Sequence, residues 1–189
     1  MSVLVELLWA FIGLVLTICG TLVEASVALP PWNGAESGIP TYSLGVTYQI
    51  GAVLLVGCLG GKNAGAISQT AYIILGLTPW FPIFDRGGGL DYIGQPAFGY
   101  ILGFLPGAWV CGALAFQTRR CVESLGLSCL GGLLTVHITG LAYLAVLTSS
   151  KQDWLALATT YSWNMLPGQL AIACAVTVLA LVTRQVLFY

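Results

Sequence analysis

Long apolar runs separated by short polar breaks are the feature that most constrains this sequence. Of its 189 residues, 58% are hydrophobic and only 7% are charged, whereas roughly a quarter of the residues of an ordinary soluble domain carry a charge. Such runs cannot form a water-facing surface, and the mean hydropathy of +0.91 indicates that they face hydrocarbon. The sequence therefore predicts an integral membrane protein.

The length of the chain suits about six transmembrane helices, because a helix needs roughly 20 residues to cross a bilayer. Six crossings use nearly the whole chain, so we expect one all-α, polytopic membrane domain over residues 1–189. The first apolar run lacks the flanks of a secretory signal, and we expect it to be retained as a helix. The expected helices are residues 3–23, 43–59, 64–77, 97–116 and 124–147, with a last segment, 154–189, that Pro167 and Gly168 divide into a short entering part and a final helix.

The connections between these runs predict an orientation. Prolines and glycines mark residues 29–41 as a loop or re-entrant stretch, and glycines at 60 and 61 break the second helix from the third. Lysine and arginine in short loops stay cytoplasmic. With the N-terminus inside, the inner side carries Lys62, Arg119, Arg120 and Arg184, against Arg86 and Lys151 outside. We therefore expect a cytoplasmic N-terminus in the cell membrane, with the polar stretch 78–96 facing outward.

Several function classes are disfavoured by the residues present. The net charge of −1 argues against a nucleic-acid partner. The chain has one histidine, no HExxH signature and no phosphate-binding loop, so we expect no enzyme activity and no cofactor, and any ATP hydrolysis must come from a partner. The six cysteines form no CxxC pair and lie mostly in apolar runs, so we expect packing roles and no metal site.

The most polar stretch carries glycines among charged and aromatic residues. Its candidate ligand-binding residues are Arg86, Gly88, Gly89, Asp91, Tyr92, Pro96 and Tyr100. Glycine-rich backbone can approach a ligand closely and offer N–H donors. Two interpretations stay open: a lid or floor over a small-molecule pocket, or a solvated loop whose charges keep it out of the bilayer.

Two further positions could contribute to such a pocket. Asn164 and Gln169 flank the proline and glycine where the last helix begins, and a helix N-terminus offers unpaired N–H groups. His137 lies in the middle of the fifth expected helix, where it either lines the pocket, relays protons or hydrogen-bonds a neighbouring helix.

A stripe of small residues runs along the first helix. It consists of Ala10, Gly13, Thr17 and Gly20, and such stripes let helices approach closely in lipid. The stripe is a candidate docking face for another membrane subunit, and a contact within the chain would explain it equally well.

An ordered series of short motifs resembles the BioY family, which supplies the biotin-binding S component of energy-coupling-factor transporters. The series comprises Tyr48-Gln49 before Ala52-Val53-Leu54-Leu55-Val56-Gly57, then Gly65-Ala66-Ile67-Ser68, Tyr72-Ile73-Ile74-Leu75-Gly76, Gly88-Gly89, Pro96-Ala97-Phe98-Gly99-Tyr100-Ile101-Leu102-Gly103-Phe104 and Leu166-Pro167-Gly168-Gln169. The resemblance implies a six-helix S-component-like bundle with an outward pocket that involves Gln49, Pro96 and Tyr100. It also implies biotin or a similar small molecule as ligand, and docking on a coupling transmembrane subunit driven by ATPases.

Departures from the family pattern leave two hypotheses. Gln169 stands where the family has an acidic residue, and Ile172 stands where it has lysine. In the first hypothesis, the protein binds biotin or a related small carboxylate for uptake. In the second, it is a BioY-like structural or assembly subunit that no longer transports and packs, among lipid, against a larger membrane complex.

Overall fold

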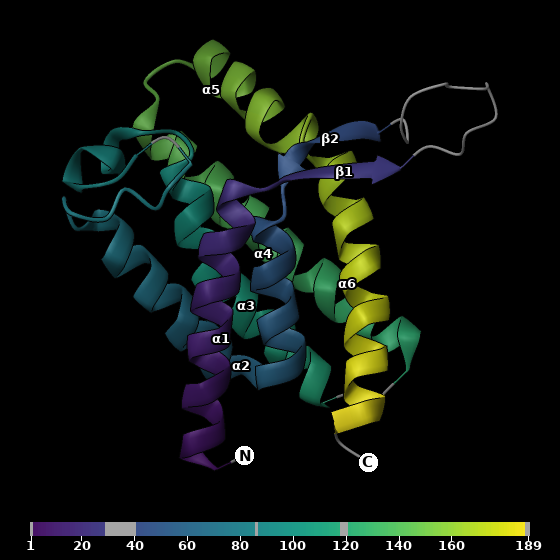
Figure 1. Cartoon of the computed structure of the whole chain (residues 1–189). Helices are drawn as coiled ribbons and strands as arrows, with labels where there is room; N and C mark the ends of the chain where they lie inside the picture. The colour runs from purple at the N-terminus through teal and green to yellow at the C-terminus, as the bar shows by residue number, and fades with distance from the viewer. Residues whose placement is uncertain (1, 29–40, 86, 118–120, 188–189) are drawn as a thin grey trace, which may run out of the picture.

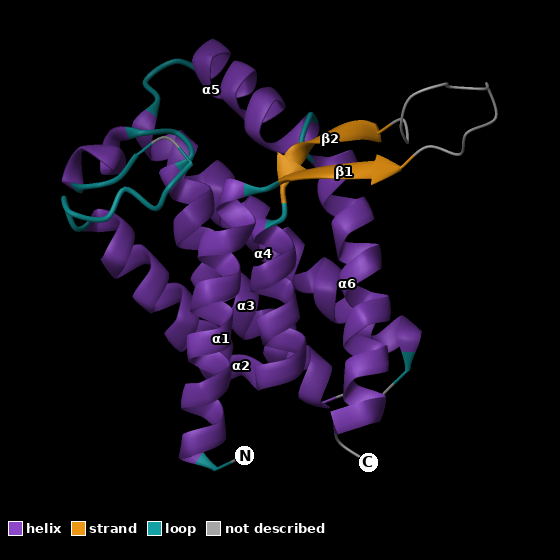
Figure 2. Ribbon diagram, in the orientation of Figure 1, coloured by secondary structure: helices purple, strands orange, loops and turns teal. Residues whose placement is uncertain are grey.

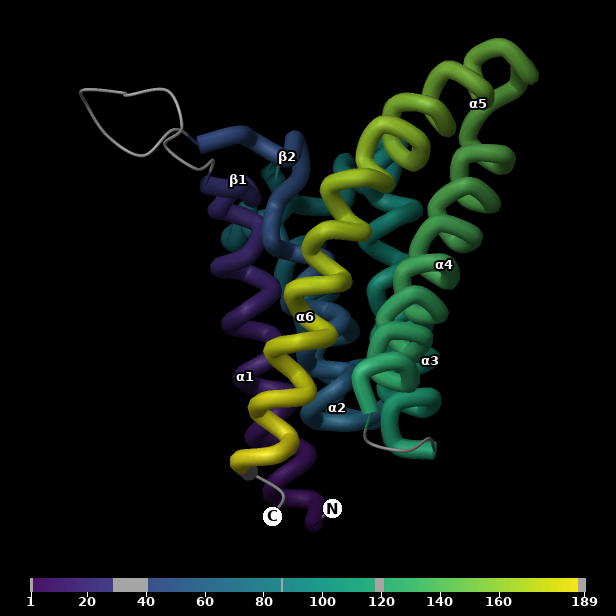
Figure 3. Tube along the Cα trace, turned by 90° about the vertical axis from the view of Figure 1, so that its right-hand side faces the viewer, coloured from purple at the N-terminus to yellow at the C-terminus, as the bar shows by residue number. Residues whose placement is uncertain are grey.

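The chain folds into a bundle of long helices capped at one end by shorter elements (Figure 1). Its structure is a computed structural model that describes residues 2–28, 41–85, 87–117 and 121–187. The elements are α1 (Val3–Leu22), β1 (Glu24–Ala28), β2 (Thr41–Thr47), α2 (Gln49–Leu77), the 3₁₀ helix η1 (Leu90–Gly94), α3 (Phe98–Gln117), α4 (Val122–Leu147), α5 (Lys151–Ala158), the π-helical turn η2 (Thr159–Trp163) and α6 (Leu166–Leu187). Both termini lie at one end of the bundle, and the hairpin, α5 and the loop with η1 lie at the other (Figures 1 and 3).

Helix α2 is two antiparallel arms joined at a sharp break. Gly61 has φ +81° and ψ −179°, so the helix reverses there. The reversal brings Gln49 beside Tyr72, whose hydroxyl accepts a hydrogen bond from Gln49 Nε2 at 2.8 Å. The predicted break between the second and third helices is therefore confirmed. Because L side chains rarely adopt this backbone conformation, the turn depends on glycine.

The predicted number of helices agrees with the structure. Five helical stretches in the described residues are long and apolar enough to cross a membrane: α1, α2, α3, α4 and the run from α5 into α6. Counting the two arms of α2 separately gives the six expected segments. Their outward faces carry large exposed apolar side chains, such as Leu8 and Phe11 of α1 and Leu134 of α4, as expected of surfaces that contact lipid.

The two-stranded sheet was not predicted. Residues 43–47, expected to begin the second helix, instead form part of β2, which pairs antiparallel with β1 (Figure 2). β2 is rich in threonine, tyrosine and valine, which favour extended backbone. Its partner strand satisfies backbone groups that a lone segment would leave unpaired. The predicted loop at residues 29–41 lies outside the described residues except for Thr41, which begins β2.

The break in the last segment lies earlier than predicted. Helix α6 begins at Leu166, so Pro167 and Gly168 stand in its first turn instead of in the interruption. Proline is tolerated there because the first N–H groups of a helix have no partner within it. The irregular backbone falls instead at η2 and the two residues after it.

The small-residue stripe of α1 faces the interior of the chain. Ala10, Gly13, Thr17 and Gly20 are all buried. A methyl group on Gly13 would lie 2.5 Å from Val56 Cγ2, and Thr17 Oγ1 accepts a hydrogen bond from Gln69 Nε2 at 3.0 Å. The contact within the chain therefore accounts for the stripe, and its position does not support a docking role, since a partner would reach it only if α2 moved away.

The break in α2 yields a stability prediction. Substitution G61A places a side chain at φ +81°, which we expect to lower the free energy of unfolding by about 1–3 kcal/mol. The matched control is G126A in α4, where an added methyl group meets no atom closer than 3.8 Å and which we expect to be neutral or stabilising. Thermal unfolding in detergent measures both, and equal midpoints for G61A and the parent chain would contradict this account of the turn.

Candidate functional site

A cavity of about 420 Å³ lies at the end of the bundle away from the termini, beneath the hairpin. The hairpin contributes its base, η1 contributes one tyrosine, the first turns of α2, α3 and α6 contribute five residues, and the others come from α1, a later turn of α3, α4, η2 and the connecting segments. The lining residues are Thr21, Leu22, Glu24, Gly45, Val46, Thr47, Gln49, Ile50, Asp85, Tyr92, Ala97, Tyr100, Ile101, Phe104, Val136, Tyr161, Met165 and Gln169. Amides, hydroxyls and carboxylates thus share one chamber with apolar side chains.

One side of the cavity is held by a chain of hydrogen bonds across four elements. The Tyr100 hydroxyl lies 2.7 Å from Ser162 Oγ, which lies 3.0 Å from His137 Nδ1. The other ring nitrogen, Nε2, lies 2.8 Å from Gln169 Oε1 and, in donating to it, fixes how the amide presents its NH₂ group. His137 therefore orients Gln169. Of the roles considered for His137, a hydrogen bond to a neighbouring helix is the one that the structure shows.

The opposite side is held by a second buried network. Tyr72 is fully buried, and its hydroxyl binds Gln49 Nε2, Thr21 Oγ1 at 3.1 Å and the Ile83 carbonyl oxygen at 3.2 Å. One hydroxyl therefore joins α1, both arms of α2 and the polar loop. Gln49 reaches the cavity with its amide nitrogen already bonded, and it offers a ligand mainly its remaining N–H and its oxygen.

The charged groups of the cavity are acidic. Glu24 and Asp85 line it, and Glu24 Oε1 accepts a hydrogen bond from Ser43 Oγ at 2.5 Å. Among the described residues that line the cavity, none is lysine or arginine. A ligand's carboxylate would therefore not be neutralised by the described lining.

The predicted site residues divide between the cavity and its surroundings. Gln49, Tyr92, Tyr100 and Gln169 line the cavity. The structure does not bring Asp91, Pro96 or Asn164 into the lining, and Asp91 and Asn164 are exposed. Arg86 lies outside the described residues.

Gly88 and Gly89, the two predicted glycines, do not line the cavity. They position the polar loop. Gly89 N donates to the Gly76 carbonyl oxygen at 2.8 Å, and a methyl group on Gly88 would lie 2.8 Å from the same oxygen. These two contacts hold the polar stretch against the end of α2. Beneath it, Phe84 packs against Tyr72, Tyr92 and Phe98 with ring centroids 4.8–6.4 Å apart, so Phe98 fills this aromatic cluster and does not line the cavity.

Several residues that line the cavity were not predicted from the sequence. Tyr161 stacks on Tyr100 with ring centroids 6.0 Å apart and an interplanar angle of 25°, and Met165 and Val46 complete the apolar part. Met165 lies between the predicted residues Asn164 and Gln169, so its place in the sequence could have suggested it. Tyr161 and Val46 carried no such signal, because one lies on an irregular turn and the other on an unexpected strand.

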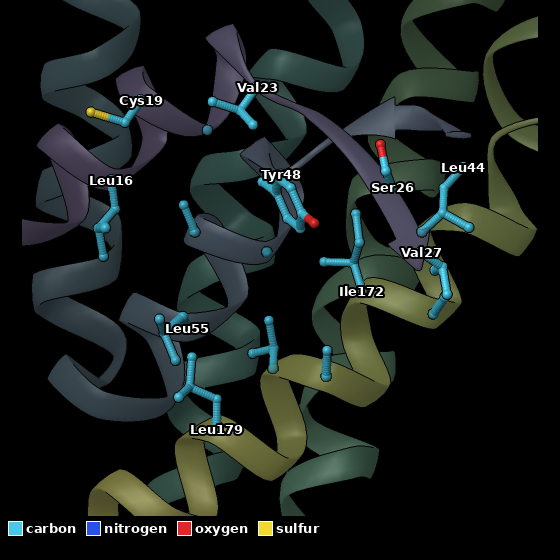
Figure 4. Close-up of a pocket in the computed structure, with 16 residues that line it drawn as sticks. Leu16, Cys19, Val23, Ser26, Val27, Leu44, Tyr48, Leu55, Ile172 and Leu179 are labelled. Carbon is cyan, nitrogen blue, oxygen red and sulfur yellow. The ribbon is translucent and has the colours of Figure 1, made fainter. Parts of the chain in front are cut away.

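Ile172 lines a separate apolar groove. The groove, about 490 Å³, runs between α1, the first arm of α2 and α6, beneath the hairpin. Figure 4 shows Leu16 and Cys19 of α1 across the groove from Ile172 of α6, with Tyr48 between them. Ile172 is 4% exposed and packs on Gly51, where an added methyl group would lie 2.8 Å from its Cγ2. Residue 172 therefore lies in an apolar contact, outside the lining of the polar cavity.

Comparison with known proteins gives concordant results. The sequence model of the BioY family matches residues 4–188. The chain is 34% identical over 136 residues to the probable biotin transporter BioY of Lysinibacillus sphaericus, across 71% of this chain and 67% of that protein. It is 26% identical over 182 residues to an uncharacterized 21.2 kDa protein from the psbX–ycf33 intergenic region of Cyanophora paradoxa, across 96% of this chain and 95% of that one.

A solved structure shares the fold. The crystal structure of the S-component for biotin from an ECF-type ABC transporter superposes with a TM-score of 0.68 at 20% identity. The match covers 98% of this chain and 95% of that one. The whole bundle, including its capping elements, therefore has a counterpart of known structure.

The Tyr72 network predicts a measurable loss of stability. Substitution Y72F leaves the Gln49 amide and the Ile83 carbonyl without this partner, and we expect the free energy of unfolding to fall by about 1–3 kcal/mol. The control is Y42F on the hairpin, whose side chain is 63% exposed and whose hydroxyl should matter little. Thermal unfolding in detergent compares the two, and an unchanged midpoint for Y72F would show that the network does not support the site.

Proposed function

The chain belongs to the BioY family of multi-pass membrane proteins, and on that premise we propose that it binds biotin, or a closely related small molecule, for uptake across the cell membrane. The observation that carries the proposal is the cavity between α1, α2, α3 and α6, which holds Gln49, Tyr100 and Gln169 together. Its volume of about 420 Å³ falls in the range of roughly 300–1,000 Å³ that small-molecule sites occupy.

The lining offers partners for both halves of biotin. A ureido group presents two N–H donors and one carbonyl acceptor, and the oxygens and N–H groups of Gln49 and Gln169 match that need. Ile50, Phe104 and Met165 line the same chamber and provide apolar contacts for the fused ring and the alkyl chain. His137 holds the Gln169 amide in one orientation, so less entropy is lost when the ligand binds.

The carboxylate of biotin needs a separate explanation, because Glu24 and Asp85 would repel it within the cavity. Arg86 follows Asp85 in the sequence, and it is the positive residue that we expect at this end. We assign to Arg86 the neutralisation of the carboxylate, with the ureido group placed deeper. The substitution of Gln169 for the family's acidic residue keeps a hydrogen-bonding group there without adding a third negative charge.

Membrane orientation and energy supply complete the proposal. A cytoplasmic N-terminus places both termini inside and the cavity outside, which suits capture of an external solute. The sequence holds no nucleotide-binding loop, so any ATP hydrolysis must come from a partner, and we assign it to ATPases that act through a coupling transmembrane subunit. With the stripe of α1 covered by α2, we assign that contact to the exposed apolar side of α1, which includes Leu4, Leu7 and Phe11 and which faces lipid when no partner is bound.

Equilibrium binding of labelled biotin to the purified protein in detergent tests the function. We expect saturable binding that Q169A and Q49A each weaken at least about tenfold, since one lost hydrogen bond in a buried site costs roughly 1.4 kcal/mol or more. The matched control N164A, an exposed amide outside the lining, should bind like the parent chain. If the protein is folded but shows no saturable binding, the transport proposal is contradicted and the structural-subunit alternative is favoured. The apolar contact of Ile172 is also compatible with that alternative.

The assignment of Arg86 has its own test. Substitution R86A should weaken binding of biotin while leaving binding of the uncharged biotin amide nearly unchanged, because only the former needs a positive partner. Lys151, the other cation expected on the outer side, is exposed and absent from the lining, so K151A is the control. Equal losses for biotin and its amide in R86A would assign the carboxylate to another group.

A further inference from the structure

Three cysteines from three different helices converge in the core of the bundle. Cys58 lies on α2, Cys111 on α3 and Cys129 on α4, and all three are fully buried. The Cys58 sulfur is 3.6 Å from the sulfurs of both Cys111 and Cys129, and the three sulfurs lie within 4.8 Å of one another. We propose that this trio is a binding site for a soft monovalent cation of the copper(I) class.

The spacing of the sulfurs suits a shared metal ion. With a metal–sulfur bond of about 2.3 Å, three sulfurs around one ion in a plane stand about 4 Å apart. The two separations of 3.6 Å from Cys58 and the upper limit of 4.8 Å for the trio are close to that value, whereas a disulfide needs its two sulfurs at about 2 Å. Small side-chain adjustments would therefore complete the metal site.

The donor set selects the type of metal. The cluster supplies only sulfur donors from cysteine, and thiolates favour copper(I) over ions that prefer oxygen ligands. A structural zinc site is usually tetrahedral with four protein ligands, and this cluster offers three. Copper(I) accepts two or three sulfurs, so the number of donors matches as well.

The charge balance favours a monovalent ion. Arg184 is 4% exposed and interacts electrostatically with Cys58, while its Nη1 donates to the Ala115 carbonyl oxygen at 2.9 Å. One copper(I) ion bound by two thiolates carries a single negative charge, which the Arg184 guanidinium offsets. The third cysteine contacts the same ion through a lone pair of its neutral thiol sulfur, so all three sulfurs are donors, and binding releases two protons to solvent. A buried site of this composition is formally neutral, as a low-dielectric interior requires.

A polar cavity of about 240 Å³ lies close to the trio along the chain, although none of the three cysteines lines it. Its lining includes Gly60, Lys62, Asn63 and Gly112. Gly112 follows Cys111 directly, and Gly60 lies two residues after Cys58. It stands at the end of the bundle with the termini, away from the proposed biotin cavity, so the two sites can be tested independently.

Chelator competition with copper(I) tests the site in the full-length protein. Variant C19S/C121S/C174S keeps the trio as its only cysteines, and we expect it to retain one copper(I) per chain against bathocuproine disulfonate under a phosphine reductant, as the parent does. Adding C129S should weaken binding by at least about 100-fold, since loss of a residue that only orients a metal ligand already costs up to about 100-fold. Loss of copper from the trio-only variant, or its retention after C129S, would overturn the proposal.

X-ray absorption keeps the proposal testable if C129S does not fold. Copper(I) bound to the trio-only variant should show sulfur as its only ligand type, with two or three sulfurs at a single short distance. Nitrogen or oxygen neighbours would place the ion elsewhere on the protein and contradict the assignment. Biotin binding should be unaffected by copper in the same samples, so failure of one site leaves the other untouched.

Discussion

Close approach of three helix backbones, α2, α3 and α4, is the interaction on which the rest of this structure depends. A methyl group on Gly112 would lie 2.5 Å from Lys62 N, one on Gly103 would lie 2.8 Å from the Val136 carbonyl oxygen, and one on Gly57 would lie 2.9 Å from that of Ala108. In lipid the hydrophobic effect does not drive helices together, so association relies on such van der Waals contact. The same approach brings Cys58, Cys111 and Cys129 together and directs Tyr100 and Val136 toward one cavity.

Polar side chains inside this bundle are placed where other elements can pair with them. His137 bonds to Ser162 and Gln169, and Tyr72 binds groups from α1, α2 and the polar loop. Unpaired polar groups are costly at membrane depth, and these pairings fix the amides that face the cavity. The cavity therefore has preorganised hydrogen-bonding groups on two sides and apolar side chains between them, which is the arrangement a small amphipathic ligand requires.

Much of the helical framework could be predicted from the sequence, because most apolar runs are close to the length of a membrane span and are separated by glycine, proline or polar residues. The break at Gly60 and Gly61 and the family resemblance were both confirmed. Gln49, Tyr92, Tyr100 and Gln169, four of the predicted site residues, line one cavity. A ligand-binding role for them stays a prediction.

Other features depend on contacts that local sequence does not encode. The strand at Thr41–Thr47 exists because β1 lies beside it, and its apolar residues also fit a helix. The convergence of three cysteines 53 and 71 residues apart is set by helix packing. The burial of the α1 stripe likewise required knowing that α2 folds back across it. Long-range packing, more than residue type, decided each of these points.

We assign the ligand site of this BioY-family protein to the cavity beneath the hairpin. A structure of the purified protein with biotin, determined by crystallography or by cryo-electron microscopy with a bound antibody fragment, tests it most directly. We expect ligand density between Tyr100, Gln49 and Gln169, with the ureido ring at the amides and the carboxylate toward Arg86. Density for biotin in the apolar groove beside Ile172, or an empty cavity at saturating ligand, would contradict it.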